Sequence, residues 1–360
     1  PPRSTLFPYT TLFRSVAAGN LICDRIRSID SWPKEGMLST VLHEEKSTGG
    51  SSCNVLVDLA RLESGIPLYA CGILGNDPDG EFVKATLENL GVDTSNVSIR
   101  EGIGSSYTDV MTVRETGRRT FFHFRGANGL LDVNDLERLR VPARIVHLGY
   151  LLLLDRLDGD DPEYGIRAAR ALHVLQRAGY ETSVDIVSEQ SARFQRIVTP
   201  CLPYIDFLIL NEIEAGNSTG CRIRTEDEGL DEEQVLEAAA RLLQGGVKKA
   251  VVIHFPEGAY GITAGGERVF EPSFQVDEKD IIGPAGAGDA CCAGVLYGLH
   301  SNLPLRRCVR LGNAAARFVL NDTTCSGSAA SLAEIEAFLS GCPDLRNDSS
   351  CRMLRRKFGG

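Results

Sequence analysis

The sequence from residue 283 to 295 reads GPAGAGDACCAGV, in which small residues surround one carboxylate, Asp289. If a helix begins here, Gly286, Ala287 and Gly288 lie at its N-terminus, where backbone N–H groups and the helix dipole can bind an anion. A carboxylate beside that anion can accept the proton of a substrate hydroxyl that attacks a phosphate group. Alternatively, Asp289 caps the helix and the glycines permit a tight turn. The stretch is neither a Walker A motif nor a complete GxGxxG fingerprint, so these residues alone leave both readings open.

The composition is that of a globular enzyme. The chain has 360 residues, of which 43% are hydrophobic and 24% charged, and this length is sufficient for one large α/β domain. The formal charge of −10 argues against nucleic acid as a partner, which would require a basic surface. ATP remains compatible, because a helix N-terminus and one or two arginines can bind it locally. The longest apolar run, residues 145–154, is shorter than the roughly 20 residues of a membrane helix, so it predicts a buried strand and no membrane partner.

The eleven cysteines occur singly or as the adjacent pair Cys291 and Cys292, and no CxxC spacing is present. This pattern favours reduced, buried thiols over disulfides or a zinc site. We therefore expect a cytoplasmic protein.

The two ends of the chain differ in character from the rest. Residues 1–15, PPRSTLFPYTTLFRS, have neither the apolar core of a signal peptide nor an amphipathic period, and they resemble a translated sequencing adapter. We therefore interpret them as non-native and place the start of the domain at residue 16. We expect this domain to extend over residues 16–340, followed by a tail of doubtful order at 341–360 whose basic end, CRMLRRKFGG, fits a solvated extension.

Between these ends, short apolar segments alternate with helical periods, which predicts an α/β fold with a mostly parallel sheet. The predicted helices cover residues 51–64, 80–90, 164–178, 233–244 and 290–299. The predicted strands cover residues 67–72, 145–148, 182–186, 207–210 and 250–255. The loops that follow such strands line the active edge of a parallel sheet.

Two regions, residues 24–45 and 105–124, break this alternation and read as antiparallel hairpins without an intervening helix. They predict a small second sheet that covers a cleft as a lid. A lid that excludes water suits phosphoryl transfer, because water would otherwise consume ATP.

Two motifs together resemble the ribokinase-like, or PfkB-type, carbohydrate kinases. One is GAGD at 286–289, followed by Ala293 and Gly294, and the other is GGSSCNVLVDLARLESGIPLYACGILGNDPDG at 49–80. They occur in the family's order and spacing, and the resemblance runs from about residue 16 to 332. It implies a ribokinase-like three-layer α/β/α core with a mostly parallel sheet and a small β-sheet lid, and an enzyme that uses ATP and Mg²⁺ to phosphorylate a sugar hydroxyl.

On the sugar side, the resemblance assigns hydroxyl binding to Asp24, with Asn20 as a helper. Gly49, Gly50 and Asn54 match the family's GGxxxN motif, in which bare backbone approaches the sugar and the amide binds it. The alternatives are a turn residue for Asp24 and a helix N-terminus at the GGxxxN motif.

Arg125, in FFHFRGAN at 121–128, matches the junction of lid and core, where related sugar kinases place an arginine near the substrate. A surface arginine is the alternative.

On the nucleotide side, Asn211 and Glu214 match the Asn-x-x-Glu motif that organises magnesium and the ATP phosphates, with Glu214 acting on Mg²⁺ through water. The alternative is a helix-capping Asn. Asn313 matches a residue that lines the adenine pocket, and Gly258 matches the glycine of the family's Thr-x-Gly strand end.

The chain departs from the family at two places. Gly283, Pro284 and Ala285 replace a segment whose Asp often takes part in a monovalent-cation site, so the requirement for potassium stays open. The segment IHFPEG at 253–258 lacks the family's small or polar residues. Within it, His254 reads as a core histidine rather than a catalytic one.

The leading hypothesis is an ATP-dependent carbohydrate kinase in which Asp289 is the base. The alternatives are a nucleoside kinase of the same superfamily, or a sugar-binding regulatory protein with the fold but no turnover. A nicotinamide-dependent dehydrogenase ranks last, because no GxGxxG with its later acidic residue follows the first strand. The exposed lid edges also predict a homodimer through the lid.

Overall fold

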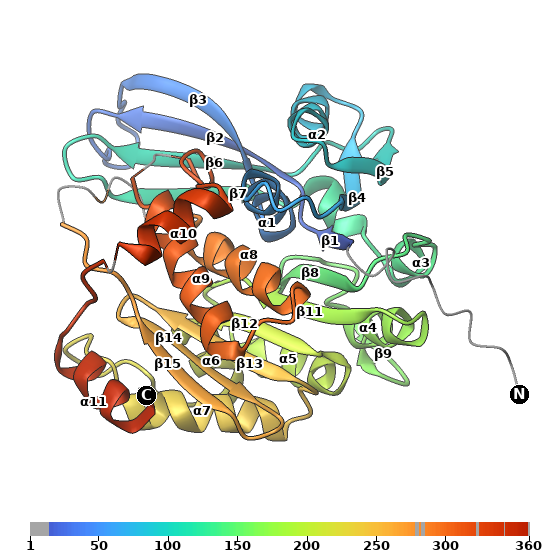
Figure 1. Cartoon of the computed structure of the whole chain (residues 1–360). Helices are drawn as coiled ribbons and strands as arrows, with labels where there is room; N and C mark the ends of the chain where they lie inside the picture. Colours follow the sequence, from blue (N-terminus) through green and yellow to red (C-terminus); the bar gives the residue numbers. More distant parts are fainter. Residues whose placement is uncertain (1–13, 278–280, 282–284, 322–323, 342, 359–360) are drawn as a thin grey trace, which may run out of the picture.

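A computed structural model describes residues 14–277, 281, 285–321, 324–341 and 343–358. Figure 1 shows a twisted central sheet covered by helices on both faces, with a smaller sheet projecting at the top. Within these residues, no helix combines the length and the apolar character that crossing a membrane requires.

The first half of the chain alternates strands with short helices. Its elements are β1 (Ser15–Gly19), β2 (Ile22–Ile29), β3 (Val41–Gly49), α1 (Ser51–Arg61), β4 (Leu68–Gly75), α2 (Pro78–Asn89), β5 (Asp93–Arg100), β6 (Tyr107–Val113), β7 (Arg119–Phe124), the 3₁₀ helix η2 (Gly126–Leu130), α3 (Val133–Glu137), β8 (Ile145–Leu151), β9 (Asp160–Asp161) and β10 (Gly165–Ile166).

The second half is richer in helix and ends on a helical segment. Its elements are α4 (Arg167–Arg177), β11 (Glu181–Ile186), α5 (Phe194–Cys201), the 3₁₀ helix η3 (Leu202–Tyr204), β12 (Phe207–Asn211), α6 (Glu212–Thr219), α7 (Glu232–Gln244), β13 (Ala250–Phe255), β14 (Gly258–Thr263), β15 (Arg268–Pro272), α8 (Ala287–His300), α9 (Leu305–Val319), α10 (Leu332–Ser340) and α11 (Ser349–Phe358).

The large sheet has nine strands in the order β15-β14-β13-β12-β11-β8-β1-β4-β5. The strands from β13 to β5 are parallel to their neighbours, while β14 and β15 run antiparallel at one edge. The predicted α/β/α core with a mostly parallel sheet is confirmed. All the predicted helices and strands occur; β13 has the predicted ends, and the others differ at one or both ends.

The two faces of this sheet bury two separate apolar clusters, which explains its helical cover. In β1, Val16 and Ala18 join the cluster that includes Leu172 of α4, whereas Ala17 joins the one that includes Leu56 of α1 and Leu296 of α8. This alternation is the period of two that a strand imposes. Consequently α1, α8 and α9 lie on one face, and α4 and α7 lie on the other (Figure 1).

The second sheet has the order β3-β2-β6-β7 and corresponds to the predicted lid. Strand β2 follows β1 after two residues, so the lid is connected directly to an interior strand of the large sheet. The carboxylate of Asp79, in the first turn of α2, pairs with Lys46 of β3 at 2.8 Å and also with Arg25 of β2. These ion pairs attach the lid to the core.

The chain after α10 returns to the core. Leu345 forms an antiparallel bridge with Phe274, and α11 buries Cys351 and Leu354 against the sheet edge formed by β15. The limits of the domain and the native start of the chain stay predictions. Residues 1–13 lie outside the described residues.

Helix α8, which carries Asp289, packs closely against α9. A Cβ built on Gly294 of α8 would lie 2.8 Å from both the Cα of Gly312 and the carbonyl oxygen of Leu311. Distances this short are incompatible with a side chain, so the two backbones touch only because both positions are glycine.

We therefore predict that Gly294→Val lowers the free energy of unfolding by about 2 kcal/mol, because overpacking forces the two helices apart. Urea unfolding of both proteins measures this difference. Gly265→Val is the control, since a Cβ there meets only the Thr263 hydroxyl at 3.7 Å. Equal stability of the two variants would contradict the packing argument.

Candidate active site

Asp289 lies in the first turn of α8 and is only 5% exposed. Its carboxylate accepts hydrogen bonds from the Asn54 amide at 2.8 Å and from the Tyr150 hydroxyl at 3.0 and 3.3 Å. Burial raises the pKa of Asp289, and the bonds from Asn54 and Tyr150 oppose that rise. The carboxylate is therefore held in one orientation by groups from α1 and β8.

The N-terminus of α8 leaves its backbone N–H groups without a side-chain cap. Gly286 is the N-cap residue, with a φ of 84°, and a Cβ there would lie 1.9 Å from the carbonyl oxygen of Cys325. Only glycine fits this position. The first N–H groups of a helix are free to bind an anion when no cap takes them, so an anion hole at Gly286, Ala287 and Gly288 stays a prediction.

The sugar-side motif lies beside Asp289. Asn54 donates its amide N–H to Asp289, while its carbonyl oxygen, Oδ1, is buried and accepts no hydrogen bond within the described residues. A buried acceptor without a donor costs free energy, and a ligand hydroxyl would satisfy it. Gly50, with a φ of 82°, makes the turn into α1, and a Cβ there would lie 2.7 Å from the carbonyl oxygen of Asn20.

Asp24 approaches the same site from β2 of the lid. It is 8% exposed, and burial together with the charge of Asp289 raises its pKa to about 7, against a hydrogen bond from Thr108. A Cβ on Gly49 would lie 2.3 Å from both carboxylate oxygens of Asp24. This contact explains the glycine at position 49 and places the first glycine of the GGxxxN motif against Asp24.

Asn20 and Arg125 are engaged by the protein itself. The Asn20 amide donates to the carbonyls of Gly149 and Tyr150 at 3.2 and 3.4 Å. Arg125 donates to the Asp155 carboxylate at 2.8 Å and lies 3.6 Å from that of Glu189. Asn20 thus joins the strand ends of β1 and β8, and a substrate contact for either residue stays a prediction.

Two further carboxylates lie close enough to Asp289 for its charge to raise their pKa values, Glu214 in the first turn of α6 and Asp185 in β11. Glu214 accepts from the Ser188 hydroxyl at 2.7 Å and from the Asn211 amide at 2.8 Å, and burial raises its pKa to about 8. The Asn211 side chain accepts a hydrogen bond from the backbone N–H of Glu214 and so caps α6. The helix-capping alternative for Asn211 is therefore compatible with its position near the site. At the end of β11, burial and then the charges of Glu214 and Asp289 raise the pKa of Asp185 well above its ordinary value.

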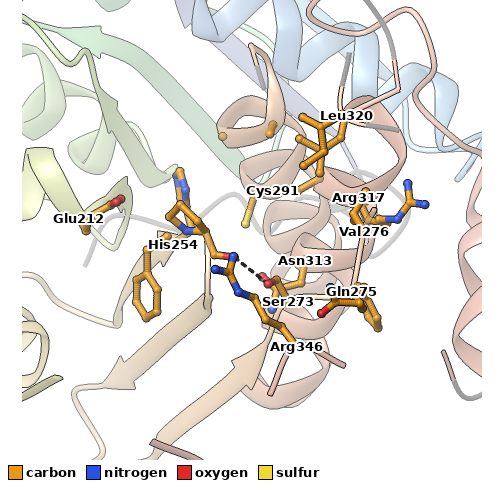
Figure 2. A pocket seen from close by; sticks show the side chains of 17 residues that line it. Glu212, His254, Ser273, Gln275, Val276, Cys291, Asn313, Arg317, Leu320 and Arg346 are labelled. Carbon is orange, nitrogen blue, oxygen red and sulfur yellow. Dashed lines mark hydrogen bonds between the residues drawn. The ribbon is translucent and has the colours of Figure 1, made fainter. Parts of the chain in front are cut away.

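A cavity of about 560 Å³ opens on the other side of the α8 N-terminus (Figure 2). Ala287, Gly288, His254 and Asn313 line it. Asn313 donates to the carbonyl oxygen of Glu271 at 2.8 Å, which holds α9 against β15.

His254 lies beside Gly288, and burial lowers its pKa to about 4. It therefore lines the cavity as a neutral side chain.

The structure describes only part of the two segments that differ from the family pattern, residues 253–258 and 283–285. Gly258 begins β14 beside this cavity without lining it. Gly283 and Pro284 lie outside the described residues. The described residues contain no group of three or more histidine, cysteine or acidic side chains placed to hold a metal ion.

Sequence reasoning missed Tyr150, Asp185 and Cys325. The thiol of Cys325 donates to Asp24 at 3.8 Å. Asp185 carried a usable signal, since it ends a predicted strand at the active edge of the sheet. Tyr150 was visible only as an interruption of an apolar run, and Cys325 follows no pattern that would place it there.

Comparison with solved structures identifies the fold. Ribokinase of Arabidopsis thaliana, complexed with ribose and ATP, superposes with a TM-score of 0.73 at 21% identity, covering 91% of this chain and 98% of that one. This likeness shows the ribokinase fold.

The sequence pattern of the pfkB family carbohydrate kinases matches residues 14–332, and the chain belongs to that family. A 5-dehydro-2-deoxygluconokinase of Geobacillus kaustophilus is 25% identical over 331 residues, which cover 85% of this chain and 88% of that protein. A nucleoside kinase of Methanocaldococcus jannaschii is 20% identical over 307 residues, covering 85% and 90%. The predicted sugar kinase is confirmed at the level of the family.

We predict that Tyr150→Phe shifts the acid limb of the kcat profile to higher pH, because removing the hydroxyl removes a bond that lowers the pKa of Asp289. Turnover measured across a pH series tests this. Tyr180→Phe is the control, since that hydroxyl donates to the carbonyl oxygen of Val141 instead. An unchanged acid limb in Tyr150→Phe would show that the Tyr150 hydroxyl does not lower the pKa of Asp289.

Proposed function

We propose that this carbohydrate kinase transfers the γ-phosphoryl group of ATP to a sugar hydroxyl, with Asp289 as the general base. The observation that carries the proposal is the position of the Asp289 carboxylate, buried in the first turn of α8 beside uncapped N–H groups. Those N–H groups can stabilise charge that develops on the phosphoryl group, while the carboxylate accepts the hydroxyl proton. A positioned base contributes about 10²- to 10⁴-fold to such a transfer.

The acceptor sugar binds between the lid and α1 in this proposal. Asn54 offers its unpaired Oδ1 to a hydroxyl, and Asp24 offers carboxylate oxygens from the opposite side. Gly49 and Gly50 bring bare backbone close to both residues. Asn20 and Arg125 then make only secondary contacts with the sugar, because both already form hydrogen bonds with other residues of the protein.

The nucleotide binds in the cavity beyond the α8 N-terminus, with Asn313 on its adenine side and Gly258 close to the strand turn. Burial, followed by the charges of neighbouring carboxylates, raises the pKa values of Asp185 and Glu214 and so disfavours their charged forms. A divalent cation would offset that repulsion. We therefore propose that Glu214 and Asn211, together with Asp185, hold Mg²⁺ through water, and that Mg²⁺ neutralises the phosphates.

The choice of acceptor is narrowed by a substrate panel. Hexoses, pentoses, 2-keto sugar acids and nucleosides would each be offered with Mg²⁺ and ATP, with and without potassium. Phosphorylation of a sugar supports the proposal, and phosphorylation of nucleosides alone favours a nucleoside kinase like the relative in Methanocaldococcus jannaschii. A sugar that binds without turnover would indicate a regulatory protein. The potassium series addresses the open cation requirement.

Asp289→Asn is expected to lower kcat by at least about 100-fold with little change in sugar affinity, because it removes the base and keeps the shape. Steady-state kinetics and equilibrium sugar binding measure the two effects. Asp93→Asn, on the exposed end of β5, is the control and should leave turnover unchanged. Normal turnover by Asp289→Asn would exclude Asp289 as the base.

We further propose that the protein is cytoplasmic and forms a homodimer through the lid. Large apolar side chains are exposed on and beside the lid sheet, which projects from the core in Figure 1. They are Trp32, Met37, Leu38, Val41, Leu42, Phe121, Phe122 and Phe124. Exposed apolar surface of this kind marks interaction sites, and the open sheet edges can pair with a second copy.

Phe122→Glu should therefore shift a dimer toward monomer in light scattering after gel filtration, because a charge would be buried at the interface. Phe122 is 51% exposed and stacks on Trp32. Ile99→Glu introduces the same charge at a position that is 43% exposed on β5, outside the lid, and should leave the mass unchanged. A wild-type monomer would contradict the dimer proposal.

A further inference from the structure

The C-terminal segment beyond the family match contributes one residue, Arg346, to the lining of the proposed nucleotide cavity. The match to the family ends at residue 332. The backbone N–H of Gln275 donates to the carbonyl oxygen of Asp344 at 2.9 Å, and the N–H of Arg346 donates to that of Ser273 at 2.8 Å. Ser273, Gln275 and Arg346 all line the cavity. The segment around residues 344–346 is thus joined to the cavity wall by these two hydrogen bonds and by the antiparallel bridge between Leu345 and Phe274.

This segment directs a guanidinium group into the cavity. The Arg346 side chain donates through Nη1 to the carbonyl oxygen of Pro256 at 3.0 Å and through Nε to the Asp348 carboxylate at 2.9 Å. Within the described residues these contacts use Nε and Nη1, which leaves Nη2 for a ligand. Figure 2 shows the Arg346 side chain reaching toward His254, whereas Arg317 extends to the opposite rim.

The charges of the side chains that line the cavity decide which groups can bind an anion there. His254 is neutral near pH 7, because burial lowers its pKa to about 4. Glu212 also lines the cavity, but Arg224 already pairs with it at 2.7 Å. Arg317 also lines the cavity, and Arg346, whose Nε pairs with Asp348, faces it near the positive end of the α8 dipole. In a chain whose formal charge is −10, these two arginines are local cations at a site for a polyanionic ligand.

We propose that Arg346 is a nucleotide-binding residue, supplied by a segment that the family pattern does not include. Its guanidinium binds the nucleoside triphosphate in the cavity, so nucleotide affinity in this protein depends on residues that follow α10. The inference rests on the proposed function, since it places the nucleotide in that cavity. Planar guanidinium groups suit this role because they bind phosphate oxygens with two parallel hydrogen bonds.

The test measures binding of a non-hydrolysable ATP analogue, AMPPNP, with Mg²⁺ and without sugar, by titration calorimetry on the full-length protein. Arg346→Ala should raise the Kd roughly 10-fold or more, as expected for loss of a charge-assisted hydrogen bond. The KM for the sugar should stay unchanged. Arg352→Ala is the matched control, because Arg352 lies in α11 and donates to the carbonyl oxygen of Asn347, outside the cavity.

A second variant separates ligand contact from a purely structural role. Asp348→Asn removes the carboxylate that pairs with Arg346 and keeps a residue able to cap α11. If Arg346 contacts the nucleotide, Asp348→Asn should bind AMPPNP at least as well as wild type, because the guanidinium is released from its partner. If both variants weaken binding equally, Arg346 only holds the segment in place, and the proposal is overturned.

The same experiment distinguishes this inference from the proposed function. Wild-type affinity for AMPPNP in Arg346→Ala would overturn the role of Arg346 and leave the kinase intact. Binding of AMPPNP that depends on Arg346, in a protein that phosphorylates no sugar, would support the role of Arg346 and reject the proposed function. A wild-type protein that binds no AMPPNP would reject both.

Discussion

The site depends on the hydrogen bonds that converge on the Asp289 carboxylate. Asn54 of α1 and Tyr150 of β8 donate to it, and it lies in the first turn of α8, whose N-terminus is the proposed anion hole. These bonds connect the sugar-side motif, the central sheet and the phosphate-side motif at one buried group. Because Asp24, Asp185 and Glu214 are also buried nearby, the charge of Asp289 would be costly without those donors. The fixed position of the Asp289 carboxylate therefore links the proposed sugar site to the proposed phosphate site.

The sequence predicted the fold well because its signals are local. Apolar periods gave the helices and parallel strands, and two segments without helices gave the lid. Gly286 and Gly50 were found through the GAGD and GGxxxN motifs, and their positive φ values and close backbone contacts explain why these positions are glycine. Asp289, Asn54 and Asp24 were found through motifs whose members lie far apart along the chain, and the structure brings all three to one place.

Other features could not be read from the sequence because they depend on distant contacts. Tyr150 reaches Asp289 across 139 positions, and no local pattern distinguishes it from another residue of a buried strand. Arg346 gains its position from two backbone hydrogen bonds and one bridge to residues 273–275. The Asn20 amide was expected near substrate, whereas its hydrogen bonds show that it also joins β1 to β8. Side-chain roles of this kind follow from the tertiary fold.

The short connection between β1 and β2 couples the position of the lid to the proposed sugar site. Asp24, the proposed sugar ligand, lies on β2, only five positions after the end of β1, so under the proposed function the lid itself contributes to the sugar site. Any displacement of the lid sheet moves Asp24 relative to Asp289. Sugar affinity and lid position are then one linked equilibrium, because a ligand favours whichever arrangement it binds more tightly. The Asp79 ion pairs with Arg25 and Lys46 bias that equilibrium.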